Sequence, residues 1–169
     1  MRIRNTISVP MLFALSLLTL AMTSASAANA QSRKAKADEN AFLEANRQKQ
    51  GVIATQSGLQ YEILAEGDSE QRVSSRDTIE LHYHGTFLDK TVFDSSLMRG
   101  KPIEIRLWDV IAGWSEGLKL MSPGDKYRFY IPSKLAYGSS ETGAIPAFST
   151  LIFEIELLSL KGKKRNSKK

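Results

Sequence analysis

The chain of 169 residues contains no cysteine, which excludes disulfides, a cysteine-ligated metal, a cysteine nucleophile and a lipid-modified cysteine. It has two histidines, His82 and His84, which are two positions apart and therefore share one face of a strand. A metal site there would require carboxylates from elsewhere in the chain, so two solvent-facing histidines are the simpler interpretation. Neither a metal site nor a cofactor is predicted.

Motifs of nucleotide-dependent and hydrolytic enzymes are also missing. The sequence has no phosphate-binding glycine loop and no Gly-x-Ser-x-Gly elbow. Ser95 and Ser96 follow Asp94 without an evident base beside them, which favours turn-capping over nucleophilic roles. Covalent, hydrolytic and nucleotide-dependent reactions are therefore poorly supported.

No apolar run is long enough for a typical membrane-spanning helix, which takes about 20 mostly apolar residues. The longest, residues 7–22, contains Ser8 and Pro10 and follows the only charges of the first thirty positions, Arg2 and Arg4. Small residues follow this run, and Ala25-Ser26-Ala27 and Ala28-Asn29-Ala30 both have the pattern of a cleavage site. We therefore predict a signal peptide over residues 1–30, cleaved after Ala27 or Ala30, with no stable membrane anchor and a periplasmic location.

Positive charge is concentrated at the ends, although the formal net charge of the whole chain is +5. Without these ends, the centre has fewer basic than acidic residues. The last nine positions hold no acid and a cluster of bases, Lys161, Lys163, Lys164, Arg165, Lys168 and Lys169. This tail, 161–169, is either solvated and disordered or binds an anionic surface. It lacks interleaved aromatics, which favours a disordered tail, and no nucleic-acid partner is predicted.

The rest of the chain predicts an α+β domain. Residues 31–57 are assigned to a linker, 31–37, and a short helix, Asp38 to Gln50, which Gly51 ends. Residues 58–160 form the main domain, in which Trp114, Leu118 and Met121 have helical spacing. Apolar residues alternate in five strand-like segments: 59–63, 79–87, 103–107, 127–131 and 151–157. We expect a curved antiparallel sheet of about five strands wrapped around one short helix.

Five aromatic residues of the main domain each adjoin a turn signal or a strand pattern, and one carboxylate, Asp94, lies directly beside one of them. The five are Tyr83, Phe93, Trp114, Tyr137 and Phe153. Such a set describes an apolar, aromatic-walled pocket with a single polar group, which suits binding and twisting a peptide better than acid–base chemistry.

Taken singly, most of these residues also have a purely structural interpretation. Alternation places the strand aromatics in the core, and Trp114 could be filler at the start of a helix. Asp94 and Arg99 could form an ordinary turn ion pair. Tyr137 is harder to explain in this way, because it lies between Ala136 and Gly138 outside any periodic run.

In order and rough spacing, five segments between Gly51 and Leu160 resemble the FKBP-type peptidyl-prolyl cis–trans isomerases. They are Tyr83 in its strand, Phe93-Asp94-Ser95-Ser96 with Arg99 close by, Val110-Ile111-Ala112-Gly113-Trp114, Ala136-Tyr137-Gly138, and Thr150-Leu151-Ile152-Phe153. The run Ser57-Gly58-Leu59-Gln60-Tyr61 further resembles the exported bacterial branch, which includes the macrophage infectivity potentiator proteins.

This resemblance implies a half-barrel sheet, an isomerase that needs no cofactor, proline-containing polypeptides as substrates and inhibition by the family's macrolide. Trp114 would form the floor of the pocket, the Ile111 N–H and the Tyr137 hydroxyl would bind substrate carbonyls, and Asp94 would lie at the edge. The walls would be Tyr83, Phe93, Val110, Ile111, Ile145 and Phe153. Relatives with long N-terminal helices form dimers, so the short helix here implies a monomer or weak dimer.

Two departures from the family pattern concern substrate preference. The frequent aromatic wall residue after a Lys-Pro pair is Ile103, and the loop 138–146 lacks the histidine sometimes found there. The same pocket could also hold proline-containing or unfolded segments as a chaperone with little turnover. The sequence leaves that alternative open.

Overall fold

The computed structural model describes residues 13–161, with side chains from Asn29 onward, and the chain divides into two units between Lys34 and Ala35. The start of the predicted signal peptide, residues 1–12, and residues 162–169 of the predicted tail lie outside this range. Lys161 is not part of a tail, because it is the last residue of a strand and pairs with Thr78. Among the described residues, no helix has both the length and the apolar character needed to cross a membrane.

Helix α1 spans Phe13–Asn46 and crosses the boundary between the two units. The short helix predicted from Asp38 to Gln50 is present only as the last part of a much longer helix, and the linker predicted over 31–37 is wrong because that segment is helical too. Its Gln, Arg, Lys and Ala residues are good helix formers, and it contains no glycine or proline. The helix ends at Asn46 rather than Gln50, and Gly51 follows at a φ of 85°, which glycine adopts without strain.

The second unit contains a seven-stranded antiparallel sheet in the order β1-β2-β6-β7-β3-β4, with β5 also paired to β3. The strands are β1 Ile53–Ala54, β2 Gln60–Ala65, β3 Thr78–Thr86, β4 Val92–Ser95, β5 Ile103–Arg106, β6 Lys126–Ile131 and β7 Leu151–Lys161. The α+β class is confirmed. Two strands lie beyond the predicted five: β1 has only two residues, and β4 places the apolar Val92 and Phe93 side by side, so neither shows alternation.

The centre of the sheet follows the predicted alternation. In β3, Ile79, Leu81 and Tyr83 are buried, and β7 buries every second residue from Leu151 to Leu157 in the same way. In β6 the alternation holds only as far as Phe129, because Tyr130 and Ile131 after it are both buried. Ile63 in β2 is an exception, since 41% of its surface is exposed. It lies beyond the two residues of β2 that β1 covers, near the edge of the sheet.

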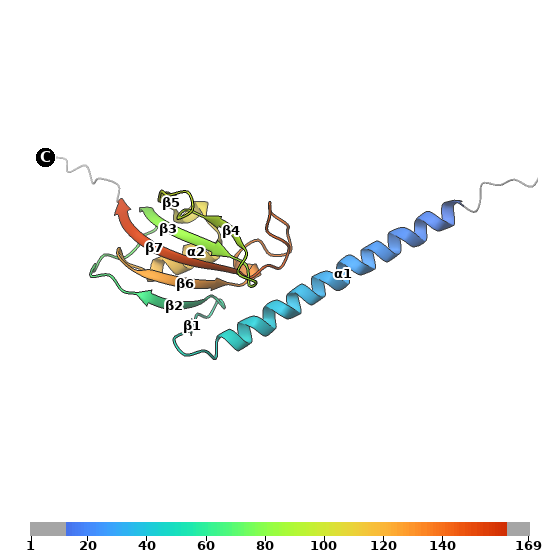
Figure 1. The fold of residues 1–169 in the computed structure, drawn as a ribbon, viewed down its shortest axis with the longest axis horizontal. Helices are drawn as coiled ribbons and strands as arrows, with labels where there is room; N and C mark the ends of the chain where they lie inside the picture. The colour runs from blue at the N-terminus through green and yellow to red at the C-terminus, as the bar shows by residue number, and fades with distance from the viewer. Residues whose placement is uncertain (1–12, 162–169) are drawn as a thin grey trace, which may run out of the picture. The chain divides into compact units, whose positions relative to one another are not determined.

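One short helix, α2 (Ala112–Gly117), lies against the inner face of this curved sheet (Figure 1), and the 3₁₀ turn η2 (Leu118–Leu120) extends it. Two glycines allow the close approach. A Cβ atom on Gly113 would collide with Ile131 Cγ2, and one on Gly117 would lie 2.6 Å from Phe129 Cε1. Because α2 packs directly on β6, the residues at its N-terminus are held at a fixed place over the sheet.

Candidate active site

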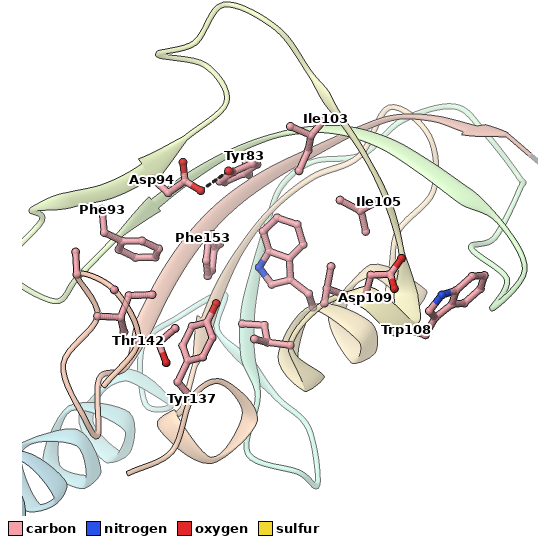
Figure 2. A pocket seen from close by; sticks show the side chains of 16 residues that line it. Tyr83, Phe93, Asp94, Ile103, Ile105, Trp108, Asp109, Tyr137, Thr142 and Phe153 are labelled. Atoms are coloured by element: carbon pink, nitrogen blue, oxygen red, sulfur yellow. Dashed lines mark hydrogen bonds between the residues drawn. The ribbon is translucent and has the colours of Figure 1, made fainter. Parts of the chain in front are cut away.

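A cavity of about 720 Å³ opens beside the N-terminus of α2 (Figure 2). Its lining comes from β3, β4, β5, β7, the 3₁₀ turn η1 (Leu107–Asp109), α2 and the loop before β7. The structure brings together there all nine residues named from the sequence: Tyr83, Phe93, Asp94, Val110, Ile111, Trp114, Tyr137, Ile145 and Phe153.

Trp114 packs edge-on against two neighbouring rings of this lining. Its ring centroid lies 5.3 Å from that of Tyr83 and 5.1 Å from that of Phe153, at interplanar angles of 74° and 84°. Phe93 meets Phe153 at 5.4 Å and 89°. Edge-to-face pairs of this kind are favourable and hold one another in place. The result is a rigid aromatic surface.

Gly85 provides the space for two of these rings. It pairs with Asp94 across β3 and β4, and a Cβ atom there would lie 2.8 Å from both Phe153 Cε1 and Phe93 Cζ. A residue larger than glycine would push both rings out of the wall.

Asp94 belongs to a three-residue cluster at the edge of the cavity. Its carboxylate accepts hydrogen bonds from the Tyr83 hydroxyl and from Arg99, and Arg99 Nη2 also donates to the Tyr83 hydroxyl at 2.7 Å. The Arg99 guanidinium lies 5.5 Å from the Tyr83 ring centroid. Both interpretations of Asp94 made from the sequence therefore apply, since it forms an ion pair with Arg99 and lines the cavity.

The cluster fixes the charge of both acidic groups. Burial, together with the hydrogen bond to Asp94, raises the pKa of the Tyr83 hydroxyl. Partial desolvation works to raise the pKa of Asp94, but the hydrogen bonds from Tyr83 and Arg99 and the charge of Arg99 outweigh it, so this pKa lies below its ordinary value. Asp94 is therefore a carboxylate and Tyr83 a neutral hydroxyl at neutral pH.

Three hydrogen-bond donors in the lining have no acceptor among the described residues. Trp114 is only 6% exposed, yet its Nε1–H has no partner. The Tyr137 hydroxyl makes no hydrogen bond within the described part of the chain, and in Figure 2 it points toward the cavity. Ile111 occupies the N-cap position of α2, where backbone N–H groups lack intrahelical acceptors. These donors could bind carbonyl oxygens of a bound chain.

Sequence reasoning did not name several residues of the lining. Trp108 and Asp109 lie at the end of the cavity opposite Phe93 and Asp94 (Figure 2), and Trp108 is 61% exposed. They directly precede Val110, a predicted wall residue, and this adjacency was the signal in the sequence that could have pointed to them. Asp109 gives the cavity a second carboxylate, so the expectation of a single polar group is wrong. The remaining lining residues that were not predicted are Ile105, Thr142, Gly143 and Ala144. Ile103 also lines the cavity, although the sequence analysis named it only as a departure from the family pattern.

The histidines lie outside this cavity. His82 Nδ1 is 3.0 Å from Ser96 Oγ and His84 Nδ1 is 3.0 Å from Ser95 Oγ, so both rings are tied to the segment that follows Asp94. Ser95 also caps the following turn, since its Oγ accepts from the Met98 N–H. Within residues 13–161 no group of three or more His, Asp or Glu residues is placed to hold a metal ion.

Comparison with protein families identifies the domain that surrounds this cavity. Residues 69–158, more than half of the chain, match the family model described as FKBP-type peptidyl-prolyl cis-trans isomerase. The chain belongs to this FKBP family. Residues 13–63 match a second model, described as the domain amino terminal to FKBP-type peptidyl-prolyl isomerase, so α1 and the first strand are family features as well.

Individual relatives place the chain in the bacterial FkpA and MIP branch of the FKBP family. The chain is 45% identical to the FKBP-type isomerase FkpA of Aeromonas hydrophila over 75% of its own length, and 44% identical to the outer membrane protein MIP of Legionella longbeachae over 78%. It covers 50% and 56% of these relatives, about half of their length. The crystal structure of Escherichia coli FkpA superimposes with a TM-score of 0.76 at 35% identity, covering 94% of this chain and 76% of that one. The FKBP-like fold is thus confirmed.

Proposed function

We propose that the protein is a peptidyl-prolyl cis–trans isomerase that acts on X–Pro bonds of exported polypeptides. The observation that carries this proposal is the aromatic cavity of an FKBP-family domain, with Trp114 on its floor and the Tyr83–Asp94–Arg99 cluster at its edge. The proline ring would lie on the Trp114 indole. Phe93, Val110, Ile145 and Phe153 would form the walls.

The cavity suits a reaction in which no bond breaks. Rotation about a peptide bond is opposed by a resonance barrier of about 18–20 kcal/mol, and an X–Pro bond left alone interconverts in about 10–100 s. Twisting the amide removes the resonance and reduces the partial charge on its carbonyl oxygen. An apolar, water-excluding surface favours the less polar twisted amide over the planar one, and only such a difference lowers a barrier. A 10⁵-fold acceleration corresponds to about 7 kcal/mol.

The polar groups of the lining would hold the chain on either side of the twisting bond. The Ile111 N–H and the Tyr137 hydroxyl would donate to substrate carbonyls and prevent the rest of the peptide from rotating. The Asp94 carboxylate would lie near the amide, where it repels the carbonyl oxygen of the planar form more than that of the twisted form. The pairing with Tyr83 and Arg99 keeps Asp94 ionised for this role.

Exchange spectroscopy by NMR on a short X–Pro peptide tests the proposal directly, because it measures the cis-to-trans rate at equilibrium. The protein should raise this rate in proportion to its concentration. A rate equal to that of the free peptide would remove the isomerase assignment and favour a chaperone. The exposed Trp108 beside the cavity supports that second candidate, and suppression of the aggregation of an unfolded protein by an isomerase-inactive variant would measure it.

The rate should not depend on pH between about 5 and 9. The pKa of Asp94 is lowered and that of Tyr83 is raised, so neither group changes its charge in this window. The contribution of Asp94 to the stability of the fold changes only at low pH. A carboxylate whose pKa is lower in the folded than in the unfolded protein stabilises the fold at pH values above its unfolded pKa of about 4, and this contribution is lost as the pH falls through its folded pKa. A pH–rate profile measured by exchange spectroscopy should vary by less than about twofold. A bell-shaped profile would indicate proton transfer and contradict the mechanism.

The macrolide that FKBP-type proteins bind should inhibit competitively, because its proline-like ring would occupy the Trp114 surface. Titration of peptide turnover with the macrolide measures this, and the fluorescence of the two tryptophans in the lining, Trp108 and Trp114, reports binding independently of turnover. Binding without competition would place the macrolide elsewhere. Absence of binding would indicate that Ile103 or the loop 138–146 prevents the macrolide from binding, since the sequence departs from the family pattern at these two places.

Location and assembly are part of the same proposal. We infer cleavage of a signal peptide after Ala27 or Ala30 and a periplasmic location, supported by the likeness to FkpA and to a relative named as an outer membrane protein. Cleavage after Ala30 would leave residues 31–46 of α1, too few for a coiled coil of several heptads. A monomer or weak dimer follows, and sedimentation of the processed chain tests this.

A further inference from the structure

Glu39, on α1, is a buried carboxylate that the proposed reaction does not use. Only 2% of its surface is exposed. It accepts hydrogen bonds from the Ser133 N–H, from Ser133 Oγ at 2.9 Å and from Thr150 Oγ1 at 3.5 Å, and Lys36 neutralises it from the solvent side. A buried charge is costly unless it is paired and hydrogen-bonded, so these partners explain why it is tolerated.

The two partners of Glu39 lie at the two ends of one loop. Ser133 begins the 3₁₀ turn η3 (Ser133–Leu135), and Thr150 directly precedes β7. Between them the chain forms the part of the cavity lining that includes Tyr137 and Ile145. A single carboxylate on a neighbouring helix therefore connects both ends of an active-site loop.

The connection continues from Ser133 to Tyr137. The Ser133 carbonyl accepts from the N–H groups of Ala136 and Gly138, at 2.9 and 2.8 Å, which are the residues on either side of Tyr137. Gly138 in turn accepts from the Phe148 N–H at 2.8 Å and closes the neck of the loop. Residues 139–144 are exposed, and a single isolated bridge, Thr142 to Ile145, pairs them. The position of Tyr137 thus depends mainly on how the ends of the loop are held.

Glu39 is not the only attachment of α1 to the domain. Asn46 Nδ2 donates to Gln60 Oε1 at 2.9 Å, Gln60 Nε2 donates to the Leu43 carbonyl at 2.8 Å, and the rings of Phe42 and Tyr130 lie 5.9 Å apart. These contacts hold the C-terminal turns of the helix on β2 and β6, and none of them involves a residue of the loop 133–150. Docking of the helix and support of the loop are therefore separable.

We propose that Glu39 is a positioning residue for isomerisation, which holds the loop 133–150 so that the Tyr137 hydroxyl faces the substrate. The proposal rests on the proposed function, in which Tyr137 donates to a substrate carbonyl. Glu39 lies beyond both predicted cleavage sites and is retained in the processed chain. The segment before the FKBP domain is thus part of the active site's support.

The test compares Glu39→Ala and Glu39→Gln with Asn46→Ala, which removes a contact of the same helix at its C-terminal residue. Glu39→Ala should lower kcat/KM about tenfold, the upper end of what a hydrogen bond from the neutral Tyr137 hydroxyl to a neutral substrate carbonyl supplies. Glu39→Gln keeps one acceptor oxygen and should fall between Glu39→Ala and the unmodified chain. Asn46→Ala should remain within twofold. Equal losses in Glu39→Ala and Asn46→Ala would overturn the proposal.

A double-mutant cycle separates positioning from general destabilisation. In a Tyr137→Phe background there is no hydroxyl left to position, so adding Glu39→Ala should lower kcat/KM by less than twofold. An undiminished tenfold loss in that background would show that Glu39 does not act through Tyr137.

Amide hydrogen exchange tests the same link without reference to activity. Glu39→Ala should speed exchange at Ala136, Gly138 and Phe148 at least tenfold, while Asn46→Ala leaves these amides unchanged. If Glu39→Ala fails to fold, Glu39→Gln takes its place in the comparison. Unchanged exchange would overturn the support of the loop. An inactive protein that still shows the exchange difference would remove the proposed function and leave this coupling intact.

Discussion

Asp94→Ala is expected to lower kcat/KM for X–Pro isomerisation by about 30- to 100-fold, which corresponds to about 2–3 kcal/mol of transition-state stabilisation. The substitution removes the charge at the edge of the cavity and the acceptor that holds Tyr83 and Arg99. Stability should change little, by about 1 kcal/mol at most, since 46% of the Asp94 side chain is exposed. Exchange spectroscopy on a short peptide and urea unfolding measure the two effects.

Asp94→Asn separates the two contributions of this residue. It keeps an acceptor for the Tyr83 hydroxyl and the volume of the side chain but removes the charge. Activity as low as that of Asp94→Ala would mean that the charge dominates, and activity near that of the unmodified protein would assign the effect to the placement of Tyr83. If Asp94→Ala itself retained full activity, Asp94 would be an ordinary turn residue paired with Arg99.

Much of the fold could be predicted because strands buried on one face alternate in polarity. Ile79, Leu81 and Tyr83 carry that pattern, and all three are buried in β3. The pattern fails in β1, which has only two residues, in β4, where the apolar Val92 and Phe93 are adjacent, and at an edge, where Ile63 remains exposed. The linker prediction failed because small and basic residues, such as Lys34 and Ala35, suit a linker and a helix equally well.

The site could be predicted in part for a similar reason. Tyr137 was conspicuous because it lies beside Gly138 outside any periodic run, whereas Trp114 at a helix start could also be explained as filler of the core. Asp109 was not predicted, because a single acidic residue near the start of a helix is ordinarily interpreted as a solvent-exposed surface residue. Glu39 is the second residue of the helix predicted from Asp38, where a negative charge is favourable without being buried, and its burial depends on Ser133, 94 positions away. Contacts over such distances leave no periodic signal in a single sequence.

Trp114→Ala should strongly destabilise the protein and remove most of its activity. Trp114 is 6% exposed and packs against Tyr83 and Phe153, so truncation leaves a void that costs about 3–5 kcal/mol of unfolding free energy. The proline ring loses its flat surface at the same time, and kcat/KM should fall by at least 100-fold. Urea unfolding followed by circular dichroism gives the first quantity, and exchange spectroscopy under conditions where the protein is folded gives the second.

Phe129→Ala is the matched control. Phe129 is 1% exposed and packs beneath α2 at Gly117, outside the cavity lining, so its loss should destabilise by a similar 3–5 kcal/mol. Its kcat/KM should stay within about threefold while the protein is folded. Trp114→Phe restores a ring and should recover part of the activity and stability. Equal losses of activity in Trp114→Ala and Phe129→Ala would show that Trp114 acts only through the core, and the proline would then have to bind elsewhere.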